Sequence, residues 1–316
     1  MLIQADARMI PLRDACVQAV ITSPPYFGLR DYGIAGQIGL EPTPDAYVAQ
    51  IVAVFREVRR VLTDDGVCWL NLGDSYWSTS GNTKTGLARL SERLDGSPRH
   101  GENWATVQGV MHGFERPKNP YGNKQLMGIP WRVAFALQAD GWYLRSDIIW
   151  HKANPMPESV TDRPTKAHEY LFLLTKSERY YYDADTIREA HTSPTIARNR
   201  HQNGGGSAES LSGDCRQDFG RMEYNVLGRN KRSVWTVATM PYAGAHFATM
   251  PEALVEPCIL AGSRMGDIVF DPFIGSGTVG AVAERLGRRW VGTDLNPAYH
   301  QLAKRRTAQC GLAFIA

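Results

Sequence analysis

The feature that most constrains the fold is a strand, a glycine turn and a helix start near the end of the chain. Residues 268–271 are a short apolar run, and Gly275 and Gly277 lie in the turn that follows. Glycines let the backbone approach a ligand closely, and a helix N-terminus presents free N–H groups. A second apolar run, residues 290–293, ends at Asp294, whose carboxylate can accept hydrogen bonds from ribose hydroxyls. This pattern predicts an α/β fold with a ligand at the strand ends.

The same glycines also match the dinucleotide fingerprint Gly275-x-Gly277-x-x-Gly280, with an acidic residue roughly 20 positions later. An NAD-dependent or flavin oxidoreductase is therefore one hypothesis. Two features argue against it. Asp271 directly precedes the turn, where a carboxylate would meet a cationic or amino-bearing ligand rather than a pyrophosphate. Only one further strand is predicted after the motif, too few for a dinucleotide-binding half to continue.

The rest of the chain shows similar α/β patterning. Thr43 is a candidate helix N-cap with Pro44 at the first helical position, and Asp64-Asp65-Gly66 is expected to end that helix. Apolar runs predict strands at residues 2–4, 19–22, 67–72, 143–150 and 169–175. Helical spacing predicts helices at residues 44–62, 129–139, 252–261 and 278–286, and a last one after the final strand.

A second turn, Ser23-Pro24-Pro25-Tyr26, directly follows the strand at 19–22. By itself such a turn is more often a proline-stiffened cap, but its groups suit one chemistry. The amine of a nucleobase is a poor nucleophile because its lone pair is delocalised into the ring. The Ser23 hydroxyl and the Pro24 carbonyl could accept its two N–H hydrogens and draw the nitrogen toward a tetrahedral geometry. Two prolines would hold that carbonyl in place, and Tyr26 offers a face for an extruded base.

Together, the strand followed by T-S-P-P-Y and the strand followed by D-P-F-x-G-S-G resemble the amino-methyltransferases of DNA. The catalytic motif comes first and the cofactor motif last, which resembles the permuted beta group of that family over nearly the whole chain. The resemblance implies a Rossmann-like S-adenosylmethionine-dependent methyltransferase fold. Its sheet would be mostly parallel and seven-stranded with one reversed strand, at residues 169–175. The motif order would be circularly permuted, with an inserted target-recognition region.

The resemblance also implies the roles of individual residues, with S-adenosyl-L-methionine as cofactor and no metal. The expected catalytic residues are Ser23, Pro24, Pro25 and Tyr26. The expected cofactor-binding residues are Asp6, Phe247, Thr249, Asp271, Pro272, Phe273, Gly275, Ser276, Gly277, Thr278, Asp294 and Asn296. The residues expected to contact the target base or DNA are Lys152, Asn154, Arg198, Arg200, Arg229 and Arg232.

The residue before P-P-Y bears on the target base. In this family Ser is typical of cytosine N4 methylation, whereas Asp or Asn is typical of adenine N6 methylation. A neutral hydroxyl at Ser23 suits cytosine, because its ring nitrogen N3 is an acceptor that a carboxylate would repel. Cytosine N4 is the predicted target and adenine N6 the alternative. Carbon-5 methylation through Pro257-Cys258 is not favoured, because Cys258 lies inside a predicted helix.

The chain divides into three parts on this interpretation. Residues 1–184 would be the catalytic half, with a loop insertion at about 78–128; residues 185–235 would be the target-recognition region, and residues 236–316 the cofactor-binding half. Both inserted stretches are rich in Lys and Arg, which suits binding to double-stranded DNA. For residues 78–128 a solvated loop explains the charges equally well. The resemblance adds a homodimer and a cognate restriction endonuclease as candidate partners.

Composition excludes other classes of protein. The net charge of +3 is too small to indicate a nucleic-acid partner by itself. The five cysteines are scattered without a C-x-x-C pair, which argues against a zinc site or a disulfide framework and favours a reducing cytoplasm. The first residues lack a secretory-signal pattern, and no apolar run reaches the ~18–20 residues that a membrane span needs.

Overall fold

The computed structural model describes residues 1–77, 122–191, 226–239 and 249–312. Its strands are β1 (Leu2–Gln4), β2 (Val17–Thr22), β3 (Leu62–Leu72), β4 (Tyr143–His151), β5 (His168–Thr175), β6 (Val234–Thr236), β7 (Ile268–Asp271) and β8 (Arg289–Asp294). Its helices are α1 (Pro44–Val61), α4 (Ile129–Ala139), the short 3-10 helix η2 (Asp185–Ile187), α6 (Glu252–Gly262), α7 (Thr278–Arg285) and α8 (Pro297–Leu312). Of these helices, none is long and apolar enough to span a membrane.

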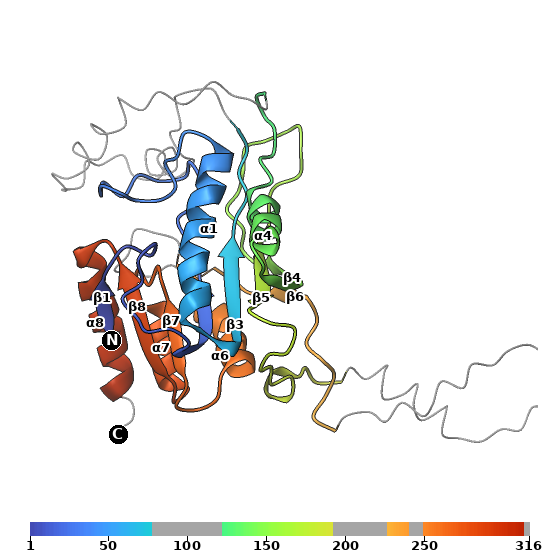
Figure 1. Cartoon of the computed structure of the whole chain (residues 1–316). Helices are drawn as coiled ribbons and strands as arrows, with labels where there is room; N and C mark the ends of the chain where they lie inside the picture. Colours follow the sequence, from blue (N-terminus) through green and yellow to red (C-terminus); the bar gives the residue numbers. More distant parts are fainter. Residues whose placement is uncertain (78–121, 192–225, 240–248, 313–316) are drawn as a thin grey trace, which may run out of the picture.

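The strands form one sheet in the order β1-β8-β7-β2-β3-β5-β4-β6 (Figure 1). Strand β5 is antiparallel to both β3 and β4, whereas the other neighbouring pairs are parallel. The predicted α/β fold with a mostly parallel sheet and a reversed strand is therefore confirmed. The sheet described has eight strands rather than the expected seven. The additional β6 is three residues long, too short to show an alternating pattern in the sequence.

Helices cover both faces of this sheet. One hydrophobic core joins α1 and α4 to one face, through residues such as Ile51, Val133 and Phe172. The other core joins α6 and α7 to the opposite face, through residues such as Ile259 and Val282. The central strand β2 is buried along its whole length because it is covered on both sides. This three-layer arrangement leaves the ends of the strands, rather than the faces, open to a ligand.

The start of α1 confirms the predicted cap, but its end differs from the prediction. The Thr43 side chain accepts a hydrogen bond from the Ala46 amide at 3.1 Å. The helix ends at Val61 and β3 begins at the next residue, so Asp64-Asp65-Gly66 lies inside β3 instead of forming a separate turn. The pairing shifts here, because Val17 pairs with Leu62 whereas Ala19 pairs with Val67. The extra residues form a bulge that the sequence pattern does not reveal.

Candidate active site

The two motif turns lie side by side. Strand β2 pairs in parallel with β7, so the turns that follow them leave the same edge of the sheet. A buried hydrogen bond joins them directly: the Thr22 hydroxyl donates to Asp271 Oδ1 at 2.7 Å. These residues are 249 positions apart in the chain. The start of the Ser23–Tyr26 turn is therefore held against the Asp271–Thr278 turn.

The glycine turn after β7 has the backbone geometry that its sequence predicts. Gly275 and Gly277 have φ values of +48° and +85°, which favour glycine. A Cβ at Gly277 would lie 2.8 Å from the Cα of Ala303, so α8 packs directly against the turn. Asp294 ties this turn to the end of β8, because its Oδ2 accepts from the Gly275 amide at 3.1 Å and its Oδ1 from the Asn296 amide at 2.8 Å.

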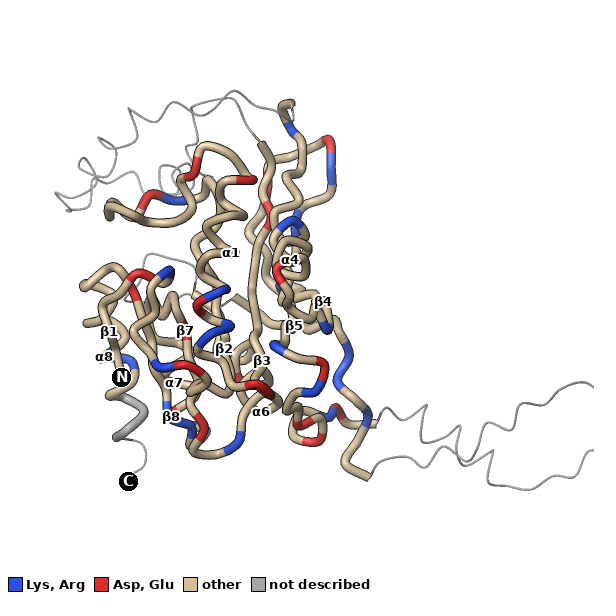
Figure 2. Tube along the Cα trace, viewed as in Figure 1, with Lys and Arg blue, Asp and Glu red and all other residues tan. Residues whose placement is uncertain are grey.

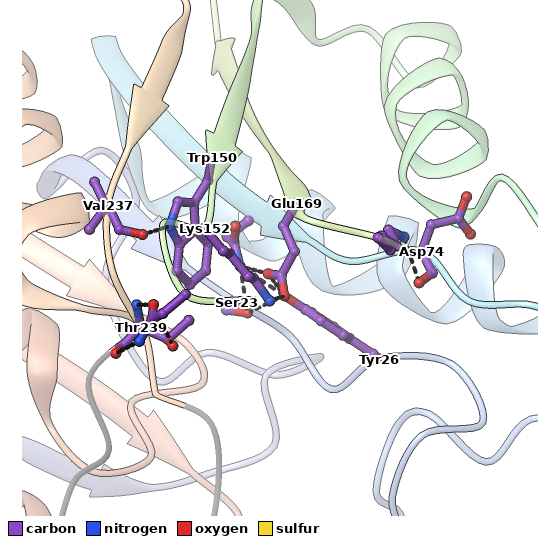
Figure 3. A network of polar contacts seen from close by, with 11 residues as sticks. Ser23, Tyr26, Asp74, Trp150, Lys152, Glu169, Val237 and Thr239 are labelled. Carbon is purple, nitrogen blue, oxygen red and sulfur yellow. Dashed lines mark hydrogen bonds and ion pairs between the residues drawn. The ribbon is translucent and has the colours of Figure 1, made fainter. Parts of the chain in front are cut away.

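Polar side chains at or just beyond the ends of four neighbouring strands, β2, β3, β5 and β4, meet beside Ser23 (Figure 3). The Tyr26 hydroxyl donates to Glu169 Oε2 at 2.6 Å, and the Lys152 ammonium donates to Glu169 Oε1 at 2.5 Å. The Asn71 amide donates to the Tyr26 oxygen at 2.8 Å and to Glu169 Oε2 at 3.0 Å. The Ser23 hydroxyl is 3.4 Å from the Tyr26 oxygen, at the end of this network.

The charges of this network are compensated within it. Burial by itself would raise the pKa of Glu169, but the charge of Lys152 and the hydrogen bonds from Lys152, Tyr26 and Asn71 outweigh it and lower that pKa. Burial, and then the charge of Glu169, raise the pKa of Tyr26 well above its usual value. Glu169 is therefore a carboxylate and Tyr26 a protonated donor at neutral pH.

Comparison with known proteins identifies the family. The DNA methylase family N6_N4_Mtase matches residues 17–305. The chain belongs to this family. It is therefore a DNA methyltransferase, and S-adenosylmethionine is its cofactor. The match removes the oxidoreductase alternative. The third glycine of the apparent dinucleotide fingerprint, Gly280, has a packing role, because a Cβ there would lie 2.9 Å from the Trp290 ring.

Similar proteins support this assignment of family and fold. The chain is 47% identical over 309 residues to the type II methyltransferase M.Cfr9I of Citrobacter freundii, covering 96% of this chain and 86% of that one. A solved PvuII DNA methyltransferase, cytosine-N4-specific, shares the fold with a TM-score of 0.62 and 16% identity, covering 96% and 85%. A Thermus thermophilus protein solved with bound S-adenosyl-L-methionine has a TM-score of 0.57 and 23% identity, covering 98% and 93%.

The surroundings of Asp271 suit the amino-bearing cofactor of this methyltransferase. Asp271 Oδ1 accepts from Thr22 and from the Phe273 amide at 3.0 Å, and within the described residues no basic side chain forms an ion pair with it. Burial raises the pKa of Asp271 to about 7, although both hydrogen bonds lower it. A buried carboxylate without a cationic partner in the described part of the protein fits the ammonium group of S-adenosylmethionine.

Asp6, Pro272 and Asn296, also expected at the methyltransferase cofactor, follow neighbouring parallel strands and so lie at the same edge of the sheet. Asp6 follows β1, whose Gln4 is in register with Asp294 of β8, and both Asp6 oxygens accept from Arg8. Asn296 Oδ1 accepts from the Ala298 amide at 2.9 Å, at the start of α8. Further along, the Pro272 carbonyl accepts from Thr293. Thr249 is half-buried before α6 and Phe273 is partly buried, whereas Phe247 lies outside the described residues.

The residues expected at the DNA are more dispersed. Lys152 belongs to the Glu169 network, whereas the Asn154 side chain forms three hydrogen bonds with Thr239. Figure 2 shows basic residues on the segment that leads into β6, beside acidic ones. Arg229 of this segment forms an ion pair with Glu189 at 3.1 Å, and Arg232 is exposed. Arg198 and Arg200 lie outside the described residues.

Three residues of the methyltransferase site were missed by sequence reasoning. Glu169 and Asn71 looked like ordinary strand residues, because only the sheet register brings them to Ser23. Arg306 of α8 donates to Ser276 Oγ at 3.2 Å, to Thr278 Oγ1 at 2.7 Å and to Glu252. Its side chain is 12% exposed, so α8 holds the glycine turn through a largely buried cation. No signal in the sequence distinguishes Arg306 from its charged neighbours.

The position of Cys258 agrees with the prediction that it is a helix core residue. It is fully buried in α6, and its thiol donates to the Leu254 carbonyl of the same helix at 3.2 Å. Burial raises the pKa of the Cys258 thiol well above its usual value. A neutral, enclosed thiol is a poor nucleophile, which is consistent with an enzyme that acts on an exocyclic amine.

Proposed function

We propose that this enzyme transfers the methyl group of S-adenosylmethionine to the N4 amino group of cytosine in duplex DNA. The observation that carries the proposal is the buried Thr22–Asp271 hydrogen bond, which holds the Ser23-Pro24 acceptors next to the glycine turn. Ser23 contributes a neutral hydroxyl at the position where the adenine N6 enzymes of this family typically have Asp or Asn. The type II methyltransferase that is 47% identical supports a role in DNA modification.

The glycine turn and Asp294 are proposed to bind the cofactor, and the Ser23-Pro24 turn is proposed to bind the target amine. Asp271 would hold the amino group of the cofactor, the turn at Gly275–Thr278 would lie against its main body, and Asp294 would accept hydrogen bonds from its ribose. When bound, the cofactor supplies an electrophilic methyl group on a sulfonium. The Ser23 hydroxyl and the Pro24 carbonyl accept the two N–H hydrogens of the target amine. This arrangement would localise the nitrogen lone pair on the amine. As the N–C bond forms, the bond from the methyl carbon to sulfur would break with its electron pair left on sulfur, and the amine would release one proton to solvent. No covalent bond to the protein is required.

The target base must leave the duplex to reach Ser23. We propose that residues 185–235 form the target-recognition region, with Arg198, Arg200, Arg229 and Arg232 at base edges or phosphates. Residues 1–184 and 236–316 are then the catalytic and cofactor-binding halves, in the permuted order of the beta group. A cognate restriction endonuclease, a homodimer and a cytoplasmic location complete this proposal.

Long-read sequencing of DNA from a methylation-deficient host that expresses the protein tests the function. We expect N4-methylcytosine at one sequence motif in cells with the wild-type protein and with the control Ser146→Ala, whose hydroxyl donates to the neighbouring Asp147 carbonyl at 3.5 Å. Ser23→Ala should remove the modification. N6-methyladenine would refute the choice of base, and full modification by Ser23→Ala would refute the catalytic assignment.

A further inference from the structure

Glu169 is the acceptor that three side chains of the active site share (Figure 3). It precedes Tyr170, which pairs with Leu72 at the end of β3, and it pairs directly with Trp150 of β4. Lys152 lies two residues beyond Trp150 and therefore on the same face of the sheet. This register brings the carboxylate, which is 14% exposed, between Tyr26 and the Lys152 ammonium.

Because Glu169 is ionised, it determines the direction of the hydrogen bonds between Glu169, Tyr26 and Ser23. A carboxylate can only accept, so the Tyr26 proton must point toward Glu169 Oε2. The Tyr26 oxygen then presents its lone pairs to the Asn71 amide and to the Ser23 hydroxyl, at 2.8 and 3.4 Å. When the Ser23 proton points toward Tyr26, two lone pairs remain on Ser23 Oγ: the Asn71 amide donates to one of them at 3.4 Å, and the other can accept from the target amine. The chain of bonds thus runs in one direction, from Ser23 through Tyr26 to Glu169.

We propose that Glu169 is a positioning residue that makes the Ser23 hydroxyl a hydrogen-bond acceptor for the target amine. The inference rests on the proposed function, because the amine that Ser23 meets is the one to be methylated. An amine N–H needs an acceptor, and a Ser23 hydroxyl that pointed its own proton outward would oppose it. Glu169 prevents that orientation through Tyr26, without touching the base.

The position of the Tyr26 ring is fixed independently of its hydroxyl. A Cβ at Gly73 would lie 2.6 Å from Tyr26 Cε2 and 3.4 Å from Glu169 Cδ. The Tyr26 ring therefore packs directly against Gly73, and a larger residue at position 73 would displace the ring. The Pro25 carbonyl, within the same turn, accepts from the buried Tyr47 hydroxyl at 2.8 Å. The turn and the ring are thus held in place, and Glu169 controls only where the proton of Tyr26 lies.

Lys152 supports the same arrangement by keeping Glu169 ionised. Burial raises the pKa of the Glu169 carboxyl, and the charge and hydrogen bond of Lys152, together with the hydrogen bonds from Tyr26 and Asn71, lower it below its usual value. Its ammonium also lies 5.0 Å from the centre of the Trp150 ring, on the face that Glu169 shares. Both oxygens of the carboxylate are thereby used: Oε1 by Lys152, and Oε2 by Tyr26 and Asn71.

The substitution Glu169→Gln tests this inference with little change in shape. Glutamine has a single carbonyl oxygen. Its amide nitrogen must therefore replace either Oε1, which faces Lys152, or Oε2, which faces Tyr26, and there it presents N–H to a donor. If the amide nitrogen faces Tyr26, the Tyr26 proton turns toward Ser23, and the Ser23 proton turns outward. We expect kcat for methyl transfer to fall roughly 10–100-fold, while the Kd for S-adenosylmethionine changes by less than about twofold.

A double-mutant cycle with Tyr26→Phe shows whether Glu169 acts through Tyr26. In an enzyme that already carries Tyr26→Phe the chain of bonds is broken, so adding Glu169→Gln should lower kcat by less than about threefold further. The control Glu256→Gln removes a carboxylate that pairs with Arg285 on the helical layer at 3.3 Å, away from the site, and should keep wild-type kcat.

Three results would overturn the inference: a Glu169→Gln enzyme with near wild-type kcat, losses that multiply in the double variant, or a parallel loss of cofactor affinity and thermal stability. Methyl incorporation from labelled cofactor is measured relative to wild type, whichever base is modified. A wild-type enzyme that methylates adenine would therefore refute the proposed base and leave this cycle interpretable.

Discussion

The buried carboxylate of Asp271 should reduce the stability of the free enzyme, and Asp271→Asn should relieve that cost. Both hydrogen bonds to Asp271 are accepted by Oδ1, so an asparagine oxygen can keep them. The pKa of Asp271 is raised by burial from 3.8 to about 7. Between pH 3.8 and about pH 7 the folded protein therefore binds more protons than the unfolded chain. The folded state loses stability relative to the unfolded chain as the pH rises through that range.

The size of the effect follows from the same two values. The difference between 3.8 and about 7 corresponds to an upper bound of roughly 4 kcal/mol, reached above pH 7. At pH 5 only about 2 kcal/mol of this cost would be present. We therefore expect the stability gain of Asp271→Asn over wild type to be larger at pH 8 than at pH 5, by up to about 2.6 kcal/mol.

Urea unfolding at pH 5 and pH 8 without cofactor measures this gain. Asp147→Asn, which changes an exposed carboxylate on β4, is the matched control and should show no such dependence on pH. Calorimetric titration at pH 8 should show that Asp271→Asn weakens binding of S-adenosylmethionine by about 10–100-fold, because the ammonium loses its charged partner. An Asp271→Asn protein no more stable than wild type at pH 8 would refute the reasoning.

Three further predictions concern the neighbouring elements. Gly277→Ala should destabilise the protein by roughly 1–3 kcal/mol in thermal or urea unfolding, because φ is +85° and the new Cβ would meet Ala303; an unchanged unfolding midpoint would contradict this. Arg306→Met should weaken cofactor binding by about tenfold in calorimetry by freeing Ser276 and Thr278, whereas the exposed neighbour Arg305→Met should not. Cys258→Ala should keep methyl transfer within about twofold of wild type, because its buried thiol lies away from the reaction; loss of activity in a folded variant would reopen carbon-5 chemistry.

The amino-acid sequence by itself determined the local structure. Short apolar runs and turn residues are properties of neighbouring positions, so the strand at 268–271, the cap at Thr43 and the two motif turns could be predicted. The family also followed from the motifs, because the pair is far more specific than either turn. Short or irregular elements could not be predicted from the sequence, because β6 is three residues long and the bulge in β3 depends on pairing with β2.

Only the tertiary structure decided which polar groups meet. The Thr22–Asp271 hydrogen bond spans 249 positions, and the pairing of β2 with β7 creates it. Glu169 reaches Tyr26 because β5 runs antiparallel beside β3, and Arg306 reaches the glycine turn because α8 packs against it. Burial and charge compensation depend on these long-range contacts rather than on local pattern. For that reason the sequence predicts the reacting groups, and the fold selects the residues that hold them in place.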